Sequence, residues 1–338
     1  MKKGLLKYHV LSLLIGSVLD LIIGDPHGIP HPIVWIGKWI GFLDRKLGPK
    51  EGEPRVPDYE RRQGMKLVAA TVVPTAALSA AALGAAYAVH PVAGVAVESA
   101  LTCYCLAARS LQKESSHVIE ELEENGLDAG RKALSMIVGR DTAELPEEEV
   151  VKAAVETVTE NTADGVVAPL MYLAAGGPVL GLTYKAINTM DSMVGYMNDR
   201  YRDLGTAAAR LDDVAGFIPA RLTGMFLSVS AGIFERLGDR AYSGRDALRI
   251  FRRDRLNHKS PNSAHSEAAA AGALGLKLGG GAYYFGKWVE KPSMGDEKRP
   301  VEHEDVKRTQ KLMYGAAGLT LAGALAGLGL FAMMRNRD

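Results

Sequence analysis

Long apolar blocks rich in alanine, leucine, glycine and valine alternate along the chain with strongly charged segments. Hydrophobic residues make up 47% of the 338 residues, so their uneven distribution is more informative than their total. Apolar runs of this length must be buried in lipid or in a large protein core. We therefore predict an all-α, multi-pass integral membrane helical bundle, with polar helical loops forming the active-site face.

The predicted bundle is a single membrane domain over residues 1–338. Its candidate membrane segments are about 8–23, 66–89, 91–110, 165–184, 213–237 and 313–334, and its polar helical segments are 112–163 and 238–312. The segments 66–89 and 91–110 are weakly hydrophobic, so a buried hairpin in a soluble helical protein is the alternative for them. No strand-like alternation persists anywhere, and the distribution of basic loops does not settle the topology.

The first apolar run follows three lysines and resembles a signal peptide, but no small-residue cleavage site follows it. We expect a retained first helix instead. Residues 32–43 are too short to span a bilayer and indicate an interfacial or re-entrant helix, with Trp35 and Trp39 at headgroup depth. Gly176-Gly177-Pro178 predicts a break in the helix over 165–184, tolerated at membrane depth only if buried in protein or lining a cavity.

Composition excludes several classes of function. The net charge is +1, with 40 basic and 39 acidic residues, so no bulk basicity points to a nucleic-acid partner. Cys103 and Cys105 lie in an apolar run and indicate core packing, not a disulfide framework or a zinc site. Neither a Walker A motif nor a G-x-G-x-x-G sequence occurs, so any nucleotide binds in an unconventional way.

A run of acidic and amide side chains interrupts the apolar pattern between residues 188 and 203. On a continuous helix, Asn188, Asp191, Gly195, Asp199 and Asp203 would fall on one stripe roughly 120° wide. Carboxylates on one face repel each other unless a cation or an arginine lies between them. The three aspartates could hold Mg²⁺, with nearby phosphate partners in Arg200, Arg202 and Arg210. A surface helix with ion pairs between neighbouring turns is the alternative.

A second acidic column, Glu156, Glu160 and Asp164, has the spacing i, i+4 and i+8. Such a column destabilises a helix unless cations relieve it. A functional site is favoured because an apolar broken helix follows immediately, and a solvated helix that ends at Asp164-Gly165 is the alternative.

Two loops could also carry chemistry. In Gly24-Asp25-Pro26-His27-Gly28-Ile29-Pro30-His31, prolines and glycines fix a loop that either binds substrate or is a structural turn. Further on, Ser260-Pro261 has the residues of a helix N-cap with proline at the first helical position. That helix start lies beside Arg255, His258 and Lys259, which predicts an anion site, although capping alone would explain Ser260 and Pro261. We expect Gly279-Gly280-Gly281 to end this helix.

Four blocks in this order resemble the CobD/CbiB family of cobalamin biosynthesis, the adenosylcobinamide-phosphate synthases. They are Leu19-Asp-Leu-Ile-Ile-Gly-Asp-Pro26 with His31-Pro32, then Glu156-Thr-Val-Thr-Glu-Asn-Thr-Ala-Asp-Gly165 with Tyr184-Lys-Ala-Ile-Asn-Thr-Met-Asp-Ser-Met-Val-Gly195, then Leu211-Asp-Asp-Val-Ala-Gly-Phe-Ile-Pro-Ala-Arg-Leu222, and His258-Lys-Ser-Pro-Asn262. The resemblance covers roughly residues 10–330. One departure is Ala264-His265-Ser266, where the family usually has a small and then a bulky apolar residue after Ser-Pro-Asn.

The resemblance implies a multi-pass enzyme of the cell membrane, a C–N bond-forming ligase. It joins a propionate carboxylate of (adenosyl)cobyric acid to the amine of aminopropanol O-phosphate with ATP and Mg²⁺, giving (adenosyl)cobinamide phosphate. A large amphipathic corrinoid suits an apolar cleft at the membrane face. Association with other late cobalamin-assembly enzymes is a further expectation.

As a hypothesis, we assign the roles in this reaction to residues of the polar blocks. Asp191, Asp199 and Asp203 hold Mg²⁺–ATP, and Glu156, Glu160 and Asp164 serve as a second metal site or as the amine base. Phosphates and cofactor are expected to meet Lys185, Asn188, Arg200, Arg221, His258, Lys259, Ser260 and Asn262. We also expect the 188–203 stripe to face the 156–164 carboxylates across a cleft floored by the broken helix.

Two other classes remain open. The acidic residues at 188–203 are similar to the aspartate-rich helices of Mg²⁺-dependent membrane prenyltransferases, although the usual Asn-Asp-x-x-Asp spacing is absent. A non-enzymatic membrane sensor similar to AmpE is the second alternative, and it predicts no need for the Glu-Asn-Thr and Ser-Pro-Asn blocks.

Overall fold

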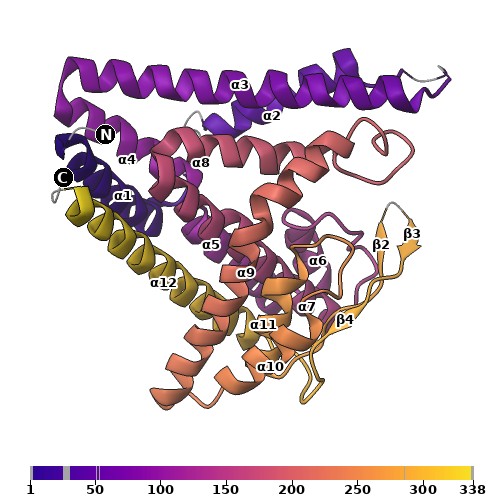
Figure 1. The fold of residues 1–338 in the computed structure, drawn as a ribbon. Coiled ribbons are helices and arrows are strands. Elements are labelled where there is room, and N and C mark those ends of the chain that lie inside the picture. The colour runs from indigo at the N-terminus through magenta and orange to yellow at the C-terminus, as the bar shows by residue number, and fades with distance from the viewer. Residues whose placement is uncertain (1–2, 26–30, 51, 53, 285, 336–338) are drawn as a thin grey trace. The chain divides into compact units, whose positions relative to one another are not determined.

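The computed structural model describes residues 3–25, 31–50, 52, 54–284 and 286–335. Helices dominate this part of the chain (Figure 1). They are α1 (Lys3–Ile23), α2 (Pro32–Leu47), α3 (Pro57–Val89), α4 (Pro91–Cys105), α5 (Ala108–Asn125), α6 (Leu127–Ser135), α7 (Glu147–Asn161), the π-helix η1 (Thr162–Val167), α8 (Ala168–Val194), α9 (Thr206–Arg236), α10 (Gly244–Asp254), α11 (Ala264–Leu274) and α12 (Glu304–Arg335). Four short strands are β1 (Leu278–Gly279), β2 (Ala282–Tyr284), β3 (Lys287–Val289) and β4 (Ser293–Met294).

Membrane-spanning helices account for most of the fold. Among the described residues, 6 helical segments are long and apolar enough to cross a bilayer. They are Leu5–Ile23, Pro57–Val89, Pro91–Asn125, Glu147–Val194, Thr206–Arg236 and Glu304–Arg335, and each contains or overlaps one predicted segment. The prediction of an all-α, multi-pass membrane protein is confirmed.

The chain forms two compact units. Unit 1 comprises residues 1–107, 168–216 and 323–338, and unit 2 comprises residues 108–167 and 217–322.

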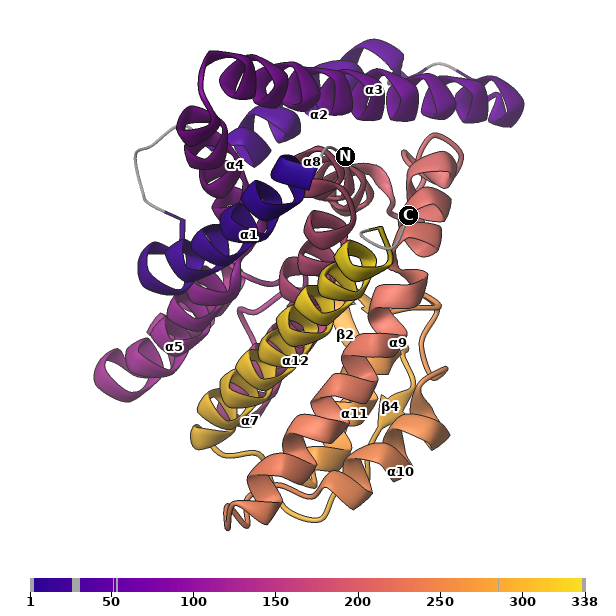
Figure 2. The same cartoon turned by 60° about the vertical axis from the view of Figure 1, so that its left-hand side comes forward.

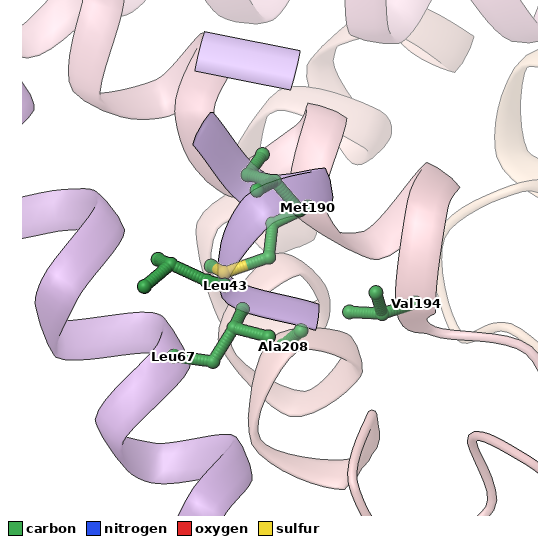
Figure 3. Close-up of a cluster of buried hydrophobic side chains, with 6 residues drawn as sticks. Leu43, Leu67, Met190, Val194 and Ala208 are labelled. Carbon is green, nitrogen blue, oxygen red and sulfur yellow. The ribbon is translucent and has the colours of Figure 1, made fainter. Parts of the chain in front are cut away.

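Unit 1 has a core at the junction of four helices. Leu43 of α2, Leu67 of α3 and Met190 of α8 are buried against one another, and Ala208 of α9 joins them (Figure 3). Elsewhere in unit 1, α1 and α4 lie side by side (Figures 1 and 2). They approach closely because α1 has a glycine there: a Cβ on Gly16 would lie 2.5 Å from the side chain of Thr102.

The predicted break in the 165–184 helix is confirmed. Gly176 and Gly177 leave the helical conformation inside α8, and Gly177 has φ 62° and ψ −162°, a combination open essentially to glycine. Such a break frees backbone groups that must find other partners. The carbonyl of Ala174 accepts a hydrogen bond from His9 Nε2 at 3.1 Å, and His9 Nδ1 lies 2.7 Å from Glu98 Oε1. Tyr87 donates to the second oxygen of Glu98.

Unit 2 is built around α11, in which all residues are buried. Helices α10 and α11 lie side by side in both views (Figures 1 and 2). Strand β1 pairs with β4 and β2 pairs with β3, both antiparallel.

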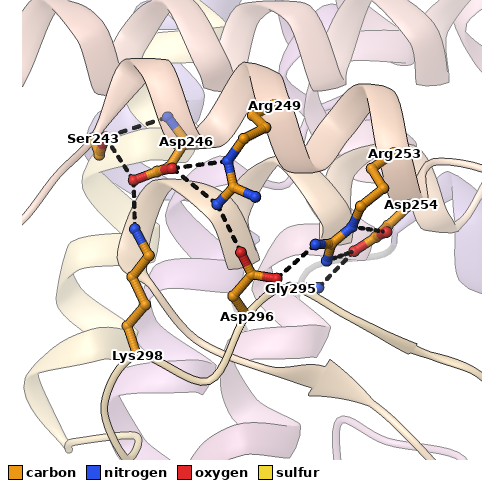
Figure 4. A network of polar contacts seen from close by, with 8 residues as sticks. All are labelled: Ser243, Asp246, Arg249, Arg253, Asp254, Gly295, Asp296 and Lys298. Atoms are coloured by element: carbon orange, nitrogen blue, oxygen red, sulfur yellow. Dashed lines mark hydrogen bonds and ion pairs between the residues drawn. The ribbon is translucent and has the colours of Figure 1, made fainter.

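A network of charges ties α10 to the segment that follows these strands (Figure 4). Asp254 accepts from both Arg253 and the backbone N–H of Gly295, while Lys298 donates to Asp246 at 2.6 Å. The hydrogen bond from Arg253 holds the pKa of Asp254 below its usual range. This network fixes the strand-bearing segment beside α11.

Several local predictions are wrong. Helix α8 ends at Val194, so residues 195–203 do not continue it. Helix α11 begins at Ala264 and ends with Gly275 in the left-handed conformation, so neither Ser260 nor Gly279–Gly281 bounds it. The four short strands were not expected, because each is too short to show alternation.

Candidate functional site

A buried carboxylate in α11 is the centre of the candidate site in unit 2. Glu267 is 8% exposed and lies in a run of otherwise alanine-rich helix. A lone charge in such a place is costly unless it is paired or neutralised. Burial, together with the nearby carboxylates of Glu160 and Glu156, raises the pKa of Glu267 well above its ordinary value. The folded protein therefore favours the protonated form of this side chain.

Helix α7 supplies the two neighbouring carboxylates. Glu156 is 5% exposed, and both its oxygens have partners: Arg140 donates at 2.5 Å and the backbone N–H of Gly279 donates at 2.7 Å. The carboxylate raises the pKa of Arg140 despite burial, which would lower it. Glu156 is thus held as a structural ion pair and not as a free base.

Glu160 differs from Glu156 because it is exposed at the surface of α7. Ser263 hydrogen-bonds to it, and the ammonium group of Lys291 lies close enough to attract the carboxylates of both Glu160 and Glu267. The helix changes to the π form immediately afterwards, in η1, where half-buried Asp164 lies. Single π-helical turns of this kind occur frequently at functional sites.

Cationic side chains contact the same segment. Ser263 contacts Glu160, and the preceding residue Asn262 accepts a hydrogen bond from Arg221 Nη1 at 3.1 Å. Arg221 also stacks on the ring of Phe217, with its guanidinium carbon 3.4 Å from the ring centroid. The segment 258–263 therefore connects an acidic cluster to a basic one.

Two histidines in the basic cluster are held neutral. Burial and the charge of Lys291 lower the pKa of His258, whose Nδ1 accepts from the N–H of Ser260 at 3.0 Å. His265 is fully buried, and burial together with Arg221 and Arg255 lowers its pKa to about 4. Within the described ranges, neither ring nitrogen of His265 has a hydrogen-bond partner.

The arrangement can bind a ligand that carries both charges. The carboxylate of Glu160 would attract an ammonium group, whose charge would in turn favour the ionised form of Glu267. The guanidiniums of Arg221 and Arg255 would attract a phosphate. Once ionised in this way, Glu267 is a stronger proton acceptor than an ordinary carboxylate, because its pKa is raised.

The structure brings together three of the predicted blocks. Glu156 and Glu160 lie near His258, Asn262 and Arg221, all within unit 2. Lys259 and Ser260 belong to the same connecting segment, where Ser260 Oγ accepts from the N–H of Asn262 at 3.3 Å and does not cap a helix.

The 188–203 block belongs to unit 1 and does not form the predicted stripe. Asn188 donates to Asp212 at 3.4 Å, and Lys185 lies half-buried on α8. Arg200 is paired with Asp44 at 3.1 Å, and Asp203 with Arg61 at 2.9 Å. The stripe fails because the chain turns after Val194 through a glycine, Gly195, and continues as a loop until α9.

No metal centre is formed by protein side chains in the part of the chain that the structure describes. Asp191, Asp199 and Asp203 do not come together, and no group of three His, Cys, Asp or Glu side chains there could hold a metal ion. In the N-terminal loop, His31 caps α2 and lies 3.1 Å from Asp25, while His27 lies outside the described residues. The expected facing of the 188–203 and 156–164 blocks stays a prediction, because they belong to different units.

Sequence reasoning missed three members of the site, Arg140, Glu267 and Lys291. Glu267 had a usable signal, because it is the one acid in the alanine-rich stretch 264–274. Arg140 and Lys291 had none, since each comes from an irregular segment whose path the pattern of apolar residues does not fix.

The comparisons with known proteins cover most of the chain. A family model described as CobD/Cbib protein matches residues 13–313. A cobalamin biosynthesis protein CobD of Geobacter metallireducens is 49% identical over 304 residues, which is 90% of this chain and 92% of that protein. The CobD protein of Pelobacter propionicus is 44% identical, covering 96% of each chain, and a cobalamin biosynthesis protein CbiB of Salmonella arizonae is 44% identical, covering 93% and 95%. No solved structure matches this sequence.

Proposed function

Because the chain belongs to the CobD/CbiB family, we propose that it acts in cobalamin biosynthesis as an ATP-dependent amide synthase. The proposed reaction joins a propionate carboxylate of cobyric acid, adenosylated or not, to the amine of aminopropanol O-phosphate. The names of the similar proteins support the pathway, and the resemblance of the motifs supports the reaction.

The observation that carries the proposal is the pairing of opposite charges in unit 2. Aminopropanol phosphate has an ammonium group at one end and a phosphate at the other. The segment 258–263 contacts the carboxylate of Glu160 through Ser263 and the guanidinium of Arg221 through Asn262. A small ligand of this kind could therefore bind with each end against groups of opposite charge.

The proposed reaction needs activation of the carboxylate, because a carboxylate and an amine do not condense appreciably in neutral water. A carboxylate oxygen takes the γ-phosphoryl group of ATP and ADP leaves. The amine nitrogen then attacks the acyl carbon, the C–N bond forms, and inorganic phosphate leaves with the former carboxylate oxygen. Most of the acceleration would come from positioning and charge neutralisation.

The protein's part in this step is to remove protons from the amine. An ammonium cannot attack, so one proton must leave before the bond forms and another as the amide is completed. We assign the acceptor role to Glu267, which is protonated in the free protein because burial and its neighbours raise its pKa. A bound ammonium group would stabilise the carboxylate form of Glu267, which could then take the proton from the amine. Glu160 would hold the ammonium, and Arg140 would keep Glu156 in place as an ion pair.

Mg²⁺ has no site of three or more His, Cys, Asp or Glu side chains among the described residues. We derive no step through it. A magnesium requirement, if measured, would belong to ATP, whose phosphates bind this ion readily. The corrinoid substrate, and association with other late cobalamin-assembly enzymes, are part of the proposal.

The test is an amide-synthesis assay on the purified protein in detergent, with ATP, Mg²⁺, cobyric acid and aminopropanol phosphate. Product of the expected mass should form only when both ATP and the amine are present. Glu267→Gln should lower kcat by about two orders of magnitude or more, the scale of general-base catalysis. Glu124→Gln, at an exposed glutamate of α5, should not change it.

Two outcomes would reject this function. One is corrinoid binding without turnover under any amine, which a non-enzymatic protein would give. The other is dependence on a prenyl diphosphate in place of ATP.

A further inference from the structure

Unit 1 contains a cavity that the site in unit 2 does not use. Its volume is about 570 Å³. Its walls are formed by Pro57, Arg61, Met197, Arg202, Asp203, Thr206, Ala209 and Arg210. Three of these residues are arginines and one is an aspartate, so the cavity carries a clear excess of positive charge.

Only one of the three arginines is neutralised by an ion pair in the wall. Arg61 lies 2.9 Å from the buried carboxylate of Asp203. Arg202 and Arg210 are exposed, and neither has an ion pair with any carboxylate of the described residues. Two guanidiniums are therefore available to an anion, while the Arg61–Asp203 pair stiffens the wall beside them.

The backbone adds to this positive field. Helix α9 begins at Thr206, and its first turns form part of the wall. The N-terminus of a helix carries partial positive charge and free N–H groups, which favour anions. The positive end of a 31-residue helix and two unpaired guanidiniums thus act on the same space.

The cavity wall is rigid where α9 starts. Ala208, next to the wall residue Ala209, is buried in the core with Met190 and Val194 (Figure 3). Gly205 fits against the end of α8 so closely that a Cβ there would lie 1.9 Å from the carbonyl oxygen of Val194. An ordered wall lowers the entropy lost when a ligand binds.

We propose that this cavity binds the phosphate chain of a nucleoside triphosphate. Guanidinium groups bind phosphate oxygens in pairs of parallel hydrogen bonds, and two unpaired arginines suit more than one phosphate. Met197 and Pro57 offer apolar surface that a nucleobase could contact. The choice of a nucleotide over a phospholipid headgroup rests on the proposed ATP-dependent function, since the two ligands share phosphate chemistry.

The experiment measures binding of ATP and of inorganic tripolyphosphate to the full-length protein in detergent, by isothermal titration calorimetry. Arg202→Gln and Arg210→Gln should each weaken both ligands about tenfold, the effect of losing one charge-assisted contact. Arg62→Gln is the matched control, because Arg62 is an exposed neighbour of Arg61 on α3 that does not line the cavity. It removes the same charge and should change the dissociation constants less than twofold.

A second experiment tests whether the phosphate that binds in the cavity belongs to a phospholipid headgroup and not to a nucleotide. The protein is placed in nanodiscs of neutral lipid with a small fraction of phosphatidylglycerol, and the retained anionic lipid is measured by native mass spectrometry. Loss of retained lipid in the Arg202 and Arg210 variants, with unchanged ATP and tripolyphosphate binding, would overturn the proposal. The proposal would also be overturned if all variants bind ATP equally and retain the same amount of anionic lipid.

The outcomes also distinguish this proposal from the proposed function. Arginine-dependent nucleotide binding without amide synthesis would leave the cavity assignment intact and reject the reaction. If amide synthesis occurs but ATP binding does not depend on Arg202 and Arg210, the cavity assignment is rejected and the proposed reaction stands. Melting temperatures of the variants within about 2 °C of the parent show that the fold is retained, as expected for surface substitutions.

Discussion

Two buried side chains of α11, His265 and Glu267, are each surrounded by charges of the sign that opposes their own ionisation. Successive α-helical positions are about 100° apart, so residues separated by two positions point in nearly opposite directions. His265 meets Arg221 and Arg255, while Glu267 meets Glu160 and Glu156. Both side chains are therefore kept neutral, and both should shape the dependence of stability on pH.

Replacing Glu267 by glutamine should stabilise the folded protein above acidic pH. The raised pKa means that this group contributes stability below the ordinary glutamate pKa of about 4.3, which is lost as pH rises through the folded-state pKa. Glu267→Gln keeps the neutral shape and removes this loss. Its advantage at pH 8 should be at least about 1 kcal/mol, the scale of one buried polar group.

Thermal unfolding of both proteins in detergent between pH 4.5 and pH 8 checks this. The difference in melting temperature between Glu267→Gln and the parent should grow with pH. The melting temperature of the control Glu124→Gln should change with pH in the same way as that of the parent. A constant difference across the range would show that Glu267 titrates normally.

Replacing His265 by leucine should change the stability of the folded protein at acidic pH. The pKa of about 4 lies below the ordinary histidine value of about 6.5, so the parent loses stability as pH falls from about 6.5 towards 4. His265→Leu removes that loss of stability. At pH 7 it also removes two buried nitrogens without hydrogen-bond partners among the described residues, whose burial destabilises the fold by about 1–3 kcal/mol.

Denaturation curves at pH 7 and at pH 5 test the second substitution. The leucine variant should be more stable than the parent at both, with the larger gain at pH 5. His117→Gln, at an exposed histidine of α5, is the control and should leave the pH dependence unchanged. A leucine variant that is less stable at pH 7 would mean that the ring is needed for packing.

Among the helices, the broken α8 shows how local sequence and distant contacts combine. Gly176-Gly177-Pro178 predicts the break, but nothing local predicts that Ala174 will be satisfied by His9 of α1, or His9 by Glu98 of α4. These partners are far apart in the sequence and meet only once α1, α4 and α8 have packed.

Substituting alanine at Gly177 should destabilise unit 1. The backbone there has φ 62°, and an added Cβ would lie 3.3 Å from Glu98 Oε1. A non-glycine residue in this region costs of order 1–3 kcal/mol. We expect Gly177→Ala to lose stability by about that amount in denaturant or thermal unfolding.

Gly84 of α3 provides the matched control. It lies in a regular helix, and a Cβ there would meet nothing within 4 Å. Gly84→Ala should be neutral or stabilising by up to about 1 kcal/mol. Equal effects at the two positions would contradict the account of the break.

The elements that the sequence predicts well are those with a strong apolar signal. The long apolar runs give the membrane helices, and Asn125-Gly126 gives the end of α5, because glycine accepts the positive φ of 87° found there. The 188–203 stripe failed because Tyr196–Arg202 is compatible with a helix, whereas the loop depends on contacts with α2 and α3, such as Arg200 with Asp44. Ser260 had the residues of a cap, yet the turn through Asn262 delays the start of α11 to Ala264.

At the scale of the whole molecule, the membrane character was evident from the sequence and the division into two units was not. Segments 108–167 and 217–322 form one unit although the 49 residues 168–216 of the other lie between them in sequence. Helices α9 and α12 each contribute to both units, and no change of composition marks the crossing at residue 216 or 322. The candidate site was therefore foreseen as sets of residues but not as the group that unit 2 assembles.

The discontinuous make-up of unit 1 imposes an order on the protein's biogenesis. Its pieces are residues 1–107, 168–216 and 323–338, and a ribosome delivers them in that order with unit 2 segments between. Helices α1 and α4 can pair in the membrane early, with His9 against Glu98, but the second partner of His9, the carbonyl of Ala174, is absent until α8 has been translated. The last piece arrives only after all of unit 2 has been made. A premature stop codon after residue 322 would therefore leave unit 2 with its full sequence and unit 1 unfinished.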